Sequence, residues 1–341
     1  MNKQKAYSEM MDRLDAIAET ITEQQAERTA AAIRKAEIYN EAFWDTMHTG
    51  MLHNSLKEGS DGSGGYLVPD TYEEKLVKSL ANKNVLRQIS NVIQTNHRMH
   101  IPVAEGDDCA DWVPEGTPFK FMDVEFGEVI LDAYKLSTSI RASDEMLEDG
   151  SVDLEKFILN VFSERIGKAE EEAFIKGDGN GKPLGLIHQA PVGSVSETAG
   201  DICLDDMINL QHSLNQVYRK NAVWLFSEDA YNTLRRINHY NGRPLWDNNL
   251  KDGEPEYLFG HRIYICKAMD DVAPGSIPVI FGDFRNYWIG DQGKRVIKRL
   301  VERYADHGQV AFITSERVDA KLVLPEAVKM LKISGTPVVD E

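Results

Sequence analysis

The most regular pattern of apolar residues runs from about Asp153 to Lys176. Apolar side chains recur there at three- and four-residue intervals, at Leu154, Phe157, Ile158, Val161, Phe162, Ile166, Ala169 and Ala173. This spacing places them in one stripe along an α-helix. Asp153 or Ser151 is a suitable N-cap, and Gly177 is a suitable end because glycine readily adopts the conformation that terminates helices. The pattern therefore predicts one long amphipathic helix.

A weaker helical pattern occupies residue 1 to about residue 40. Its apolar positions are Met10, Leu14, Ile17 and Ile21. A helix with so few apolar residues needs a partner, because short helices are marginal in water by themselves. An apolar cluster from Ala42 to Met47 follows, and then the segment KEGSDGSGG from Lys57 to Gly65, which is typical of a flexible linker. We place a boundary in this linker and expect residues 1 to about 55 to assist assembly.

The region from Arg98 to Ile140 has an extended pattern. It contains the polar stretch IPVAEGDDCADWVPEGTPFKF, followed by alternating apolar residues at Val129, Leu131 and Leu136. This predicts a long two-stranded excursion with a polar tip. Because an isolated two-stranded ribbon is marginally stable in water, we expect another subunit to support it.

The remaining patterns mix helices and strands. Tyr72 to Leu80 predicts a short helix, and Val85 to Ile93 continues the apolar pattern toward a strand. Further helices are predicted at Leu204 to Tyr218 and Glu228 to Ile237, and strands at Ala222 to Ser227, Arg262 to Cys266, Pro278 to Phe284 and through Arg295 to Leu331. This mixture predicts an α+β fold, and a length of 341 residues favours two or more lobes.

Composition restricts the function classes. Hydrophobic residues make up 42% of the chain and charged residues 27%, which is typical of a folded soluble protein. No apolar run is long enough to span a bilayer, and the N-terminus lacks a secretory segment, so we expect a protein made in a cytoplasm. The formal net charge of −17 disfavours nonspecific binding to nucleic acid. A protein that only surrounds DNA can still be acidic, because repulsion between the two negatively charged surfaces keeps the DNA from adhering to the protein.

Two groups of residues suggest a ligand site at first sight. The run Gly177 to Lys182 is rich in glycine, but a phosphate-binding loop needs glycine where Lys176 stands and serine or threonine where Pro183 stands. His97 and His100 lie three residues apart in a predicted strand, so they point to opposite faces. Neither group predicts a nucleotide or metal site.

Other reactive side chains are also better explained as structural. Asp107, Asp108 and Asp111 lack the pattern of a calcium loop, and Ser227 is not in a nucleophile elbow. The cysteines are odd in number and far apart, at Cys109, Cys203 and Cys266. We therefore predict no catalytic residue, no cofactor-binding residue and no metal ligand.

Five segments, taken in order, resemble a known family. They are EGSDGSGGYLVP at 58–69, WVPEG at 112–116, LSTSIRASDEML at 136–147, EEEAFIKGDGNGKPLGLI at 170–187 and ERVDAKLVLPEAVKML at 316–331. Together they resemble the major capsid proteins of tailed bacteriophages, whose fold is called the Johnson fold or Hong Kong phage capsid fold. The resemblance covers nearly all of residues 58–333.

The resemblance implies a division of the chain into the parts of that fold. Residues 1–57 become a helical N-terminal segment in the place of a reduced scaffolding region, and the resemblance leaves open whether a protease removes it. The other implied parts are the N-terminal arm and start of the peripheral domain at 58–97, the extended E-loop at 98–140, the peripheral domain with its spine helix at 141–199, the axial domain at 200–295 and the returning peripheral strands at 296–341.

The resemblance also implies a function without catalysis or cofactors. The chain would form pentamers and hexamers of itself and build the icosahedral head shell around double-stranded DNA, without sequence-specific binding. It would assemble in the host bacterial cytoplasm and end in the virion, with no membrane association. A portal protein, a scaffolding function or maturation protease, and a decoration protein are the implied partners. The alternatives are an encapsulin-like nanocompartment shell and an intracellular hydrolase.

Some members of the family join their subunits by an isopeptide bond between a lysine of the E-loop and an asparagine, helped by a buried glutamate. Lys120 is a candidate donor in this chain. Alignment through Glu316 and Arg317 places Gly308 at the asparagine position and Ser315 at the glutamate position. An exposed lysine without a base stays protonated at neutral pH. We therefore predict a shell held together without covalent bonds.

Overall fold

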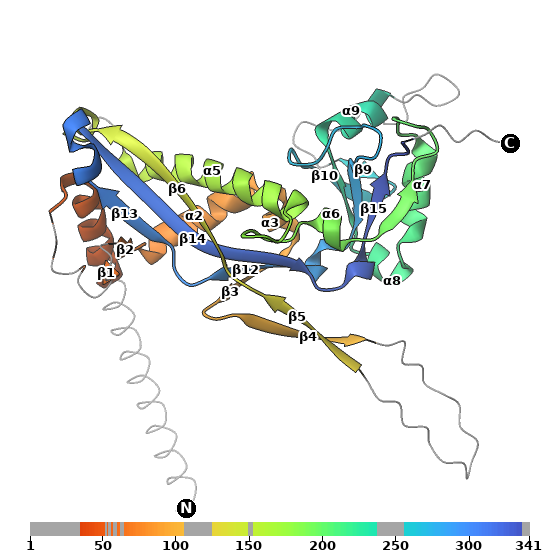
Figure 1. Cartoon of the computed structure of the whole chain (residues 1–341), viewed down its shortest axis with the longest axis horizontal. Coiled ribbons are helices and arrows are strands. Elements are labelled where there is room, and N and C mark those ends of the chain that lie inside the picture. Colours follow the sequence, from red (N-terminus) through yellow and green to blue (C-terminus); the bar gives the residue numbers. More distant parts are fainter. Residues whose placement is uncertain are drawn as a thin grey trace, which may run out of the picture. The chain divides into compact units, whose positions relative to one another are not determined.

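Figure 1 shows a computed structural model of the chain, which describes residues 35–51, 53, 56, 60–61, 65–105, 125–148, 153–236 and 256–335. The chain divides into two compact units. Unit 1 consists of Met1–Lys75, Ser139–Ile158 and Val296–Ile313, and unit 2 of Leu76–Thr138, Leu159–Arg295 and Thr314–Glu341. Helix α2 (Asp70–Lys83), helix α5 (Leu154–Lys176) and strand β14 (Gln309–Leu322) contribute residues to both units.

Unit 1 combines a helix at residues 35–49 with short strands. Strand β1 (Ser60–Asp61) pairs antiparallel with β2 (Gly65–Leu67), which pairs antiparallel with β13 (Val296–Leu300). Helix α4 (Asp144–Glu148) and the 3-10 helix η3 (Glu302–His307) complete it. Its core contains the fully buried side chains of Phe43, Met47, Leu56 and Tyr72.

In unit 2, strand β12 (Tyr287–Gln292) lies between two neighbours. It pairs antiparallel with the later part of β14 and parallel with β3 (Asn91–Thr95). Helix α3 (Val85–Ile89) precedes β3. The chain then forms a two-stranded antiparallel ribbon from β4 (Met99–Glu105) and β5 (Glu125–Leu131), and continues into β6 (Tyr134–Ser143).

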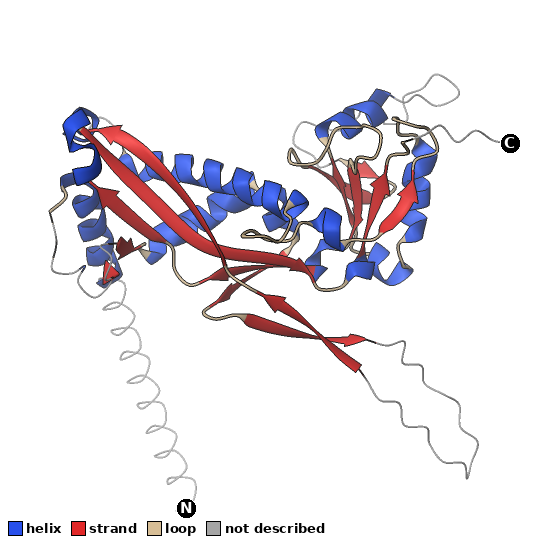
Figure 2. Ribbon diagram, in the orientation of Figure 1, coloured by secondary structure: helices blue, strands red, loops and turns tan. Residues whose placement is uncertain are grey.

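The rest of unit 2 is a six-stranded sheet with helices around it (Figure 2). Its strand order is β7 (Val192–Val195), β15 (Val328–Lys332), β11 (Val279–Gly282), β8 (Val223–Phe226), β10 (His261–Ile265) and β9 (Tyr257–Leu258). The helices are α6 (Leu186–Gln189), α7 (Leu204–Ser213), α8 (Gln216–Arg219) and α9 (Glu228–Arg236), and the 3-10 helices are η2 (Phe284–Asn286) and η4 (Pro325–Ala327).

Alternation along the strands divides the core of this sheet into two clusters. Leu225 and Ile280 belong to one cluster, and Trp224, Phe226 and Phe281 belong to the other. Successive residues of a strand point to opposite faces, so adjacent positions of β8 and β11 enter different clusters. Both faces of the central strands are therefore buried.

The predicted α+β class is confirmed, and so is the long helix. Helix α5 begins at Leu154, directly after Asp153, whose Oδ1 accepts a hydrogen bond of 3.1 Å from the backbone N–H of Lys156. It ends at Gly177, where a Cβ atom would lie 2.0 Å from the carbonyl oxygen of Pro183. Only glycine fits this close backbone approach.

Several local predictions need correction. Residues from Val85 begin as helix α3 before strand β3, because the Asn84 side chain caps the N–H groups of Leu86 and Arg87. The predicted helix from Leu204 is broken into α7 and α8. The first strand predicted from Arg295 ends at Leu300, because η3 follows there, whereas β14 confirms the strand prediction from Gln309 onward.

Two predictions concern residues that lie outside the described part of the chain. The polar tip of the ribbon falls between residues 105 and 125, and most of the first predicted helix falls before residue 35. Among the described helices, none combines the length and apolar character needed to cross a lipid bilayer.

Candidate functional site

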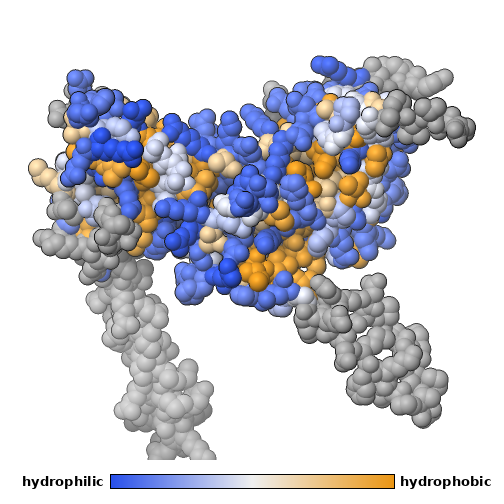
Figure 3. All heavy atoms as spheres, in the orientation of Figure 1, coloured by the Kyte–Doolittle hydropathy of each residue, from blue (hydrophilic) through white to orange (hydrophobic). Residues whose placement is uncertain are grey.

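The β4–β5 ribbon has one apolar face. Met99 pairs directly with Leu131, Ile101 with Val129 and Val103 with Gly127. Directly paired residues share a face, so the described side chains of Met99, Ile101, Val103, Val129 and Leu131 lie on one apolar face. Figure 3 shows hydrophobic side chains gathered on the ribbon next to its grey tip.

The opposite face of the ribbon is more polar. It carries His100, Pro102, Glu128 and Ile130, and His100 Nδ1 lies 2.6 Å from Glu128 Oε1. On the apolar face, Ile101 and Leu131 are buried, whereas Val103 and Val129 remain partly exposed. Among the described elements, the main packing partner of each ribbon strand is the other strand. The ribbon therefore presents apolar surface that its own subunit covers only in part.

The base of the ribbon is fixed to β12 and β14. Leu131 packs over Gly290, where an added Cβ would lie 3.4 Å from the leucine Cδ1. The backbone N–H of Asp132 donates a 2.7 Å hydrogen bond to Asp319 Oδ2, and Asp132 also pairs with Arg98 at 2.5 Å. Asp319 is fully buried, and burial raises the pKa of its carboxyl group. These contacts hold one end of the ribbon in place.

Beside this base, five charged side chains form a buried cluster that the sequence analysis missed. They come from α3, α5, β12, the segment between β12 and β13, and β14, and are Arg87, Glu170, Asp291, Arg295 and Glu316. The exposed fraction of each residue is 8% or less. We call this set the charge cluster.

Arg87 is the centre of the charge cluster. Its Nε and Nη2 donate to the two carboxylate oxygens of Glu170 at 2.7 and 2.5 Å. Its Nη1 and Nη2 donate to the two oxygens of Asp291 at 3.0 and 2.8 Å. Such paired hydrogen bonds match the fork of the guanidinium group. Burial alone would lower the pKa of Arg87, but the two carboxylates raise it well above its ordinary value.

Arg295 extends the charge cluster from Asp291 to Glu316. Its Nη2 lies 3.3 Å from Asp291 Oδ2, and its Nε lies 2.5 Å from Glu316 Oε2. Burial alone would raise the pKa of Asp291, but the neighbouring Arg87 and Arg295 hold it below its ordinary value. Asp291 is therefore ionised at neutral pH.

Glu316 behaves differently from Asp291. Burial, and next the negative charge of Glu170, raise the pKa of Glu316 to about 8, although Arg295 and Arg87 act in the opposite direction. Its Oε1 has no hydrogen-bond partner among the described residues. The charge cluster holds three carboxyl groups and two guanidinium groups, so a proton on Glu316 removes the excess negative charge.

Only some of the residues singled out in the sequence lie in the described part of the chain. His97 lies in the turn before β4, while His100 pairs with Glu128, and no described residue joins the two histidines into a metal site. The Ser227 hydroxyl accepts a hydrogen bond from the N–H of Ala230 at the start of α9, which is a structural role. The loop from Gly177 ends α5 and contains the bridge between Asp178 and Leu184. Asp107, Asp108, Cys109, Asp111 and Lys120 lie outside the described residues.

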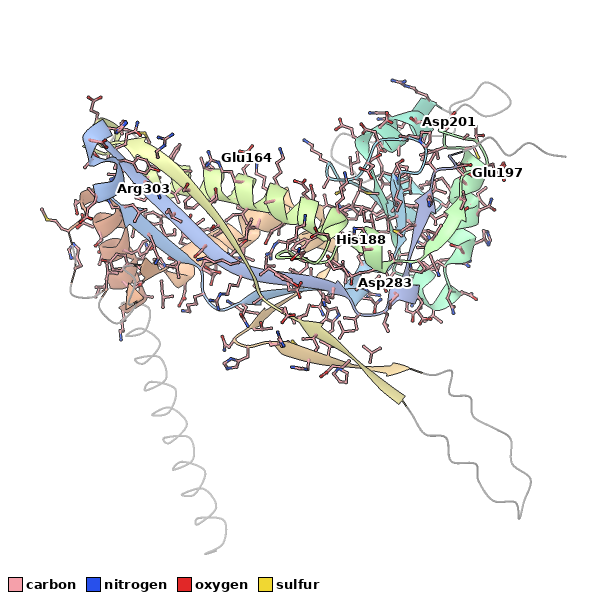
Figure 4. The ribbon with its side chains drawn as sticks, in the orientation of Figure 1. Glu164, His188, Glu197, Asp201, Asp283 and Arg303 are labelled. Atoms are coloured by element: carbon pink, nitrogen blue, oxygen red, sulfur yellow. The ribbon has the colours of Figure 1, made fainter. Side chains whose placement is uncertain are left out.

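One group of potential ligand atoms lies near the start of α7. Atoms of Glu197, Cys203 and Asp205 lie within 4.8 Å of one another. Figure 4 labels Glu197 and Asp201, both in the segment leading into this helix. Burial raises the pKa of the Cys203 thiol, which disfavours the thiolate that binds metals. Cys203 is also the N-cap residue of α7, and Asp206, which is not a member of the group, accepts a hydrogen bond from its backbone N–H.

Comparisons with known proteins identify sequence relatives of this chain. The major capsid protein of Klebsiella oxytoca phage phiKO2 is 22% identical over 247 residues, which are 68% of this chain and 57% of that protein. The major capsid protein of Halomonas phage phiHAP-1 is 21% identical over 217 residues, 61% of this chain and 36% of that protein. The chain thus spans about half of the first relative and about a third of the second.

Solved structures agree with these sequence relatives. The capsid of a native GTA particle, computed with C5 symmetry, has a TM-score of 0.65 at 26% identity and covers 73% of this chain and 89% of its own. Gordonia phage Cozz has a TM-score of 0.57 at 14% identity, with 74% and 87% covered, and shows the shared fold alone. A sequence profile described as the phage capsid family matches residues 64–333. The chain belongs to the phage capsid family.

Proposed function

We propose that this chain is a major capsid subunit, which assembles with copies of itself into an icosahedral head shell around double-stranded DNA. The observation that carries the proposal is the apolar face of the β4–β5 ribbon, which its own subunit covers only in part. A ribbon of two strands gains stability when a third element covers its apolar face. Repeating such a contact between copies gives each subunit a large interface, for which about 1,600 Å² is a standard size.

The parts of the subunit follow from this proposal. Residues 98–140 act as the E-loop that lies on a neighbouring subunit, and residues 58–97 act as the N-terminal arm and the start of the peripheral domain. The peripheral domain continues through residues 141–199 and 296–341, and the axial domain at residues 200–295 meets its copies in pentamers and hexamers. The C5 symmetry of the GTA capsid supports pentamers of this kind.

The proposed subunit has no catalytic role. It works with a portal protein, with a scaffolding function or maturation protease, and with a decoration protein, and it assembles in the host bacterial cytoplasm. The net charge of −17 supports a shell that encloses DNA without sequence-specific binding. The relatives named above are phage and GTA proteins, and they support neither a nanocompartment shell nor a hydrolase.

Substitution on the apolar face of the ribbon tests the proposal. Val129→Asp places a charge where a neighbouring subunit would cover it, and burying an unpaired charge is strongly unfavourable. We expect the yield of closed particles, counted by electron microscopy, to fall about tenfold or more, because each subunit carries the defect.

Nuclease-protected DNA inside wild-type particles would separate a virion shell from a nanocompartment.

Pro102→Asp is the matched control, because Pro102 is exposed on the opposite face of the same ribbon. We expect this variant to form particles in normal yield. Circular dichroism should show that both variants remain folded. Normal particles from Val129→Asp would contradict the role of the apolar face, and a wild-type protein that stays monomeric under all assembly conditions would contradict the proposed function itself.

A second prediction concerns the bonds between subunits. Gly308 ends η3 in the left-handed conformation, with a φ of 61°, and has no side-chain amide to accept a lysine. Glu316 is buried and paired with Arg295, so it does not offer a base to an exposed lysine. We expect mature particles boiled in denaturant to run as single subunits on a gel, and Lys120→Ala to leave this unchanged. A ladder of oligomers that Lys120→Ala abolishes would show that a covalent bond forms.

A further inference from the structure

The helix at residues 35–49 belongs to the core of unit 1, although a linker-like sequence separates it from the rest of the chain. Phe43 and Met47 are fully buried in this helix, and Trp44 is 9% exposed. Leu56, just before the linker, is also fully buried. A helix that served only as a transient assembly aid would not need to bury its aromatic residues inside its own subunit.

The contacts of this helix cross the linker. The ring of Trp44 lies 5.1 Å from the ring of Tyr72 in α2, measured between centroids. The Tyr39 hydroxyl donates a 2.8 Å hydrogen bond to the carbonyl oxygen of Leu67, the last residue of β2. The Thr71 hydroxyl donates to Asn40 Oδ1 at 3.2 Å. The helix therefore covers both β2 and the start of α2.

The end of the helix is fixed as well. Arg299 of β13 donates a hydrogen bond of 3.4 Å from Nη2 to the carbonyl oxygen of His48. The chain then turns at Gly50, which has a φ of +78°, and a Cβ atom there would lie 2.4 Å from Arg299 Nη1. The hydroxyl of Thr46 donates to the carbonyl oxygen of Met51 at 2.8 Å. The positive φ of this turn favours glycine, whereas the end of the arginine side chain could move aside for a Cβ atom.

We propose that residues 35–56 are a permanent structural part of the shell subunit, so that any truncation or protease cleavage that keeps the unit 1 fold lies before residue 35. That the subunit belongs to a shell rests on the proposed function, whereas the need of the unit 1 fold for residues 35–56 does not. The sequence prediction that residues 1 to about 55 assist assembly stays a prediction, and residues 35–56 have a structural role in their own subunit besides. The buried aromatic contacts with Tyr72 carry this inference.

Two truncations of the full chain test the proposal. We expect deletion of residues 2–56 to lower the melting temperature of the unassembled protein by about 10 °C or more relative to deletion of residues 2–34, or to prevent folding. Mass spectrometry of subunits from mature particles should find residues 35–56 still attached. Equal melting of both truncations, or stable mature particles whose subunits begin after residue 56, would overturn the proposal.

Point variants keep the test informative if the longer truncation fails to fold. We expect Trp44→Ala to lower the melting temperature by about 10 °C, and Trp44→Phe to lower it less because an aromatic ring still faces Tyr72. Glu41→Ala is the matched control, because Glu41 is exposed on the same helix. A Trp44→Ala protein that melts like Glu41→Ala would contradict the inference. Because melting is measured on unassembled subunits, failure to form particles would count only against the proposed function.

Discussion

Replacing Arg87 by alanine is expected to reduce the free energy of unfolding by about 3–5 kcal/mol. The reason is that Arg87 alone bridges Glu170 and Asp291 with paired hydrogen bonds. Without it, two buried carboxylates face each other with only Arg295 nearby as a buried cation. Removing one member of a buried ionic group leaves uncompensated charge, which is more harmful than never having had the group. Urea unfolding followed by circular dichroism measures the loss.

The control is an ion pair of the same chemistry at the surface. Lys156 pairs with Asp153 at 2.9 Å, and the two side chains are 78% and 50% exposed. We expect Lys156→Ala to change stability very little, because water screens such pairs. Replacing Arg87, Glu170 and Asp291 together by apolar residues should be less damaging than Arg87→Ala. An Arg87→Ala protein as stable as Lys156→Ala would show that the charge cluster does not support the fold.

The parts of the fold that the sequence predicted are those determined by neighbours in the chain. Helix α5 was found because its apolar stripe, its cap at Asp153 and its end at Gly177 all lie within one continuous segment. Strand β8 was found because an apolar run of strand length lies between polar neighbours. A short apolar segment without such signals is ambiguous, as the change from α3 to β3 after Val85 shows.

Features that depend on distant residues were not predicted. Arg87 and Asp291 of the charge cluster are 204 residues apart, and nothing in a single sequence indicates that they meet. The sequence did carry two signals that these carboxylates are buried, because Asp291 follows apolar residues in β12 and Glu170 lies on a helix with a buried face. The apolar cluster around Trp44 was recognised, but its partner Tyr72 lies beyond a linker that suggested separation.

Raising the pH is expected to destabilise the protein through Glu316. In the unfolded chain its carboxyl group loses a proton near the ordinary value of 4.5, whereas in the fold its pKa is about 8. Between these values the folded state binds the proton and the unfolded state does not, so stability falls as the pH rises. Below this window both states are protonated, and above it both are ionised. Each unit of difference between the folded and unfolded pKa values of Glu316 corresponds to about 1.4 kcal/mol. The loss of stability across the window therefore has an upper limit of roughly 5 kcal/mol.

Glu316→Gln isolates this effect from that of other carboxyl groups. Glutamine is neutral at every pH, and its carbonyl oxygen can still accept the hydrogen bond that Arg295 Nε donates to Glu316 Oε2. Asp291, whose pKa is lowered, contributes stability that is lost only in acid, so it does not disturb the window. We expect unfolding measurements from about pH 5 to about pH 9 to show the wild type losing stability relative to the variant as pH rises, and then levelling. If the difference in stability between the wild type and Glu316→Gln is independent of pH, Glu316 is ionised in the folded protein. The charge cluster would then carry an unbalanced negative charge.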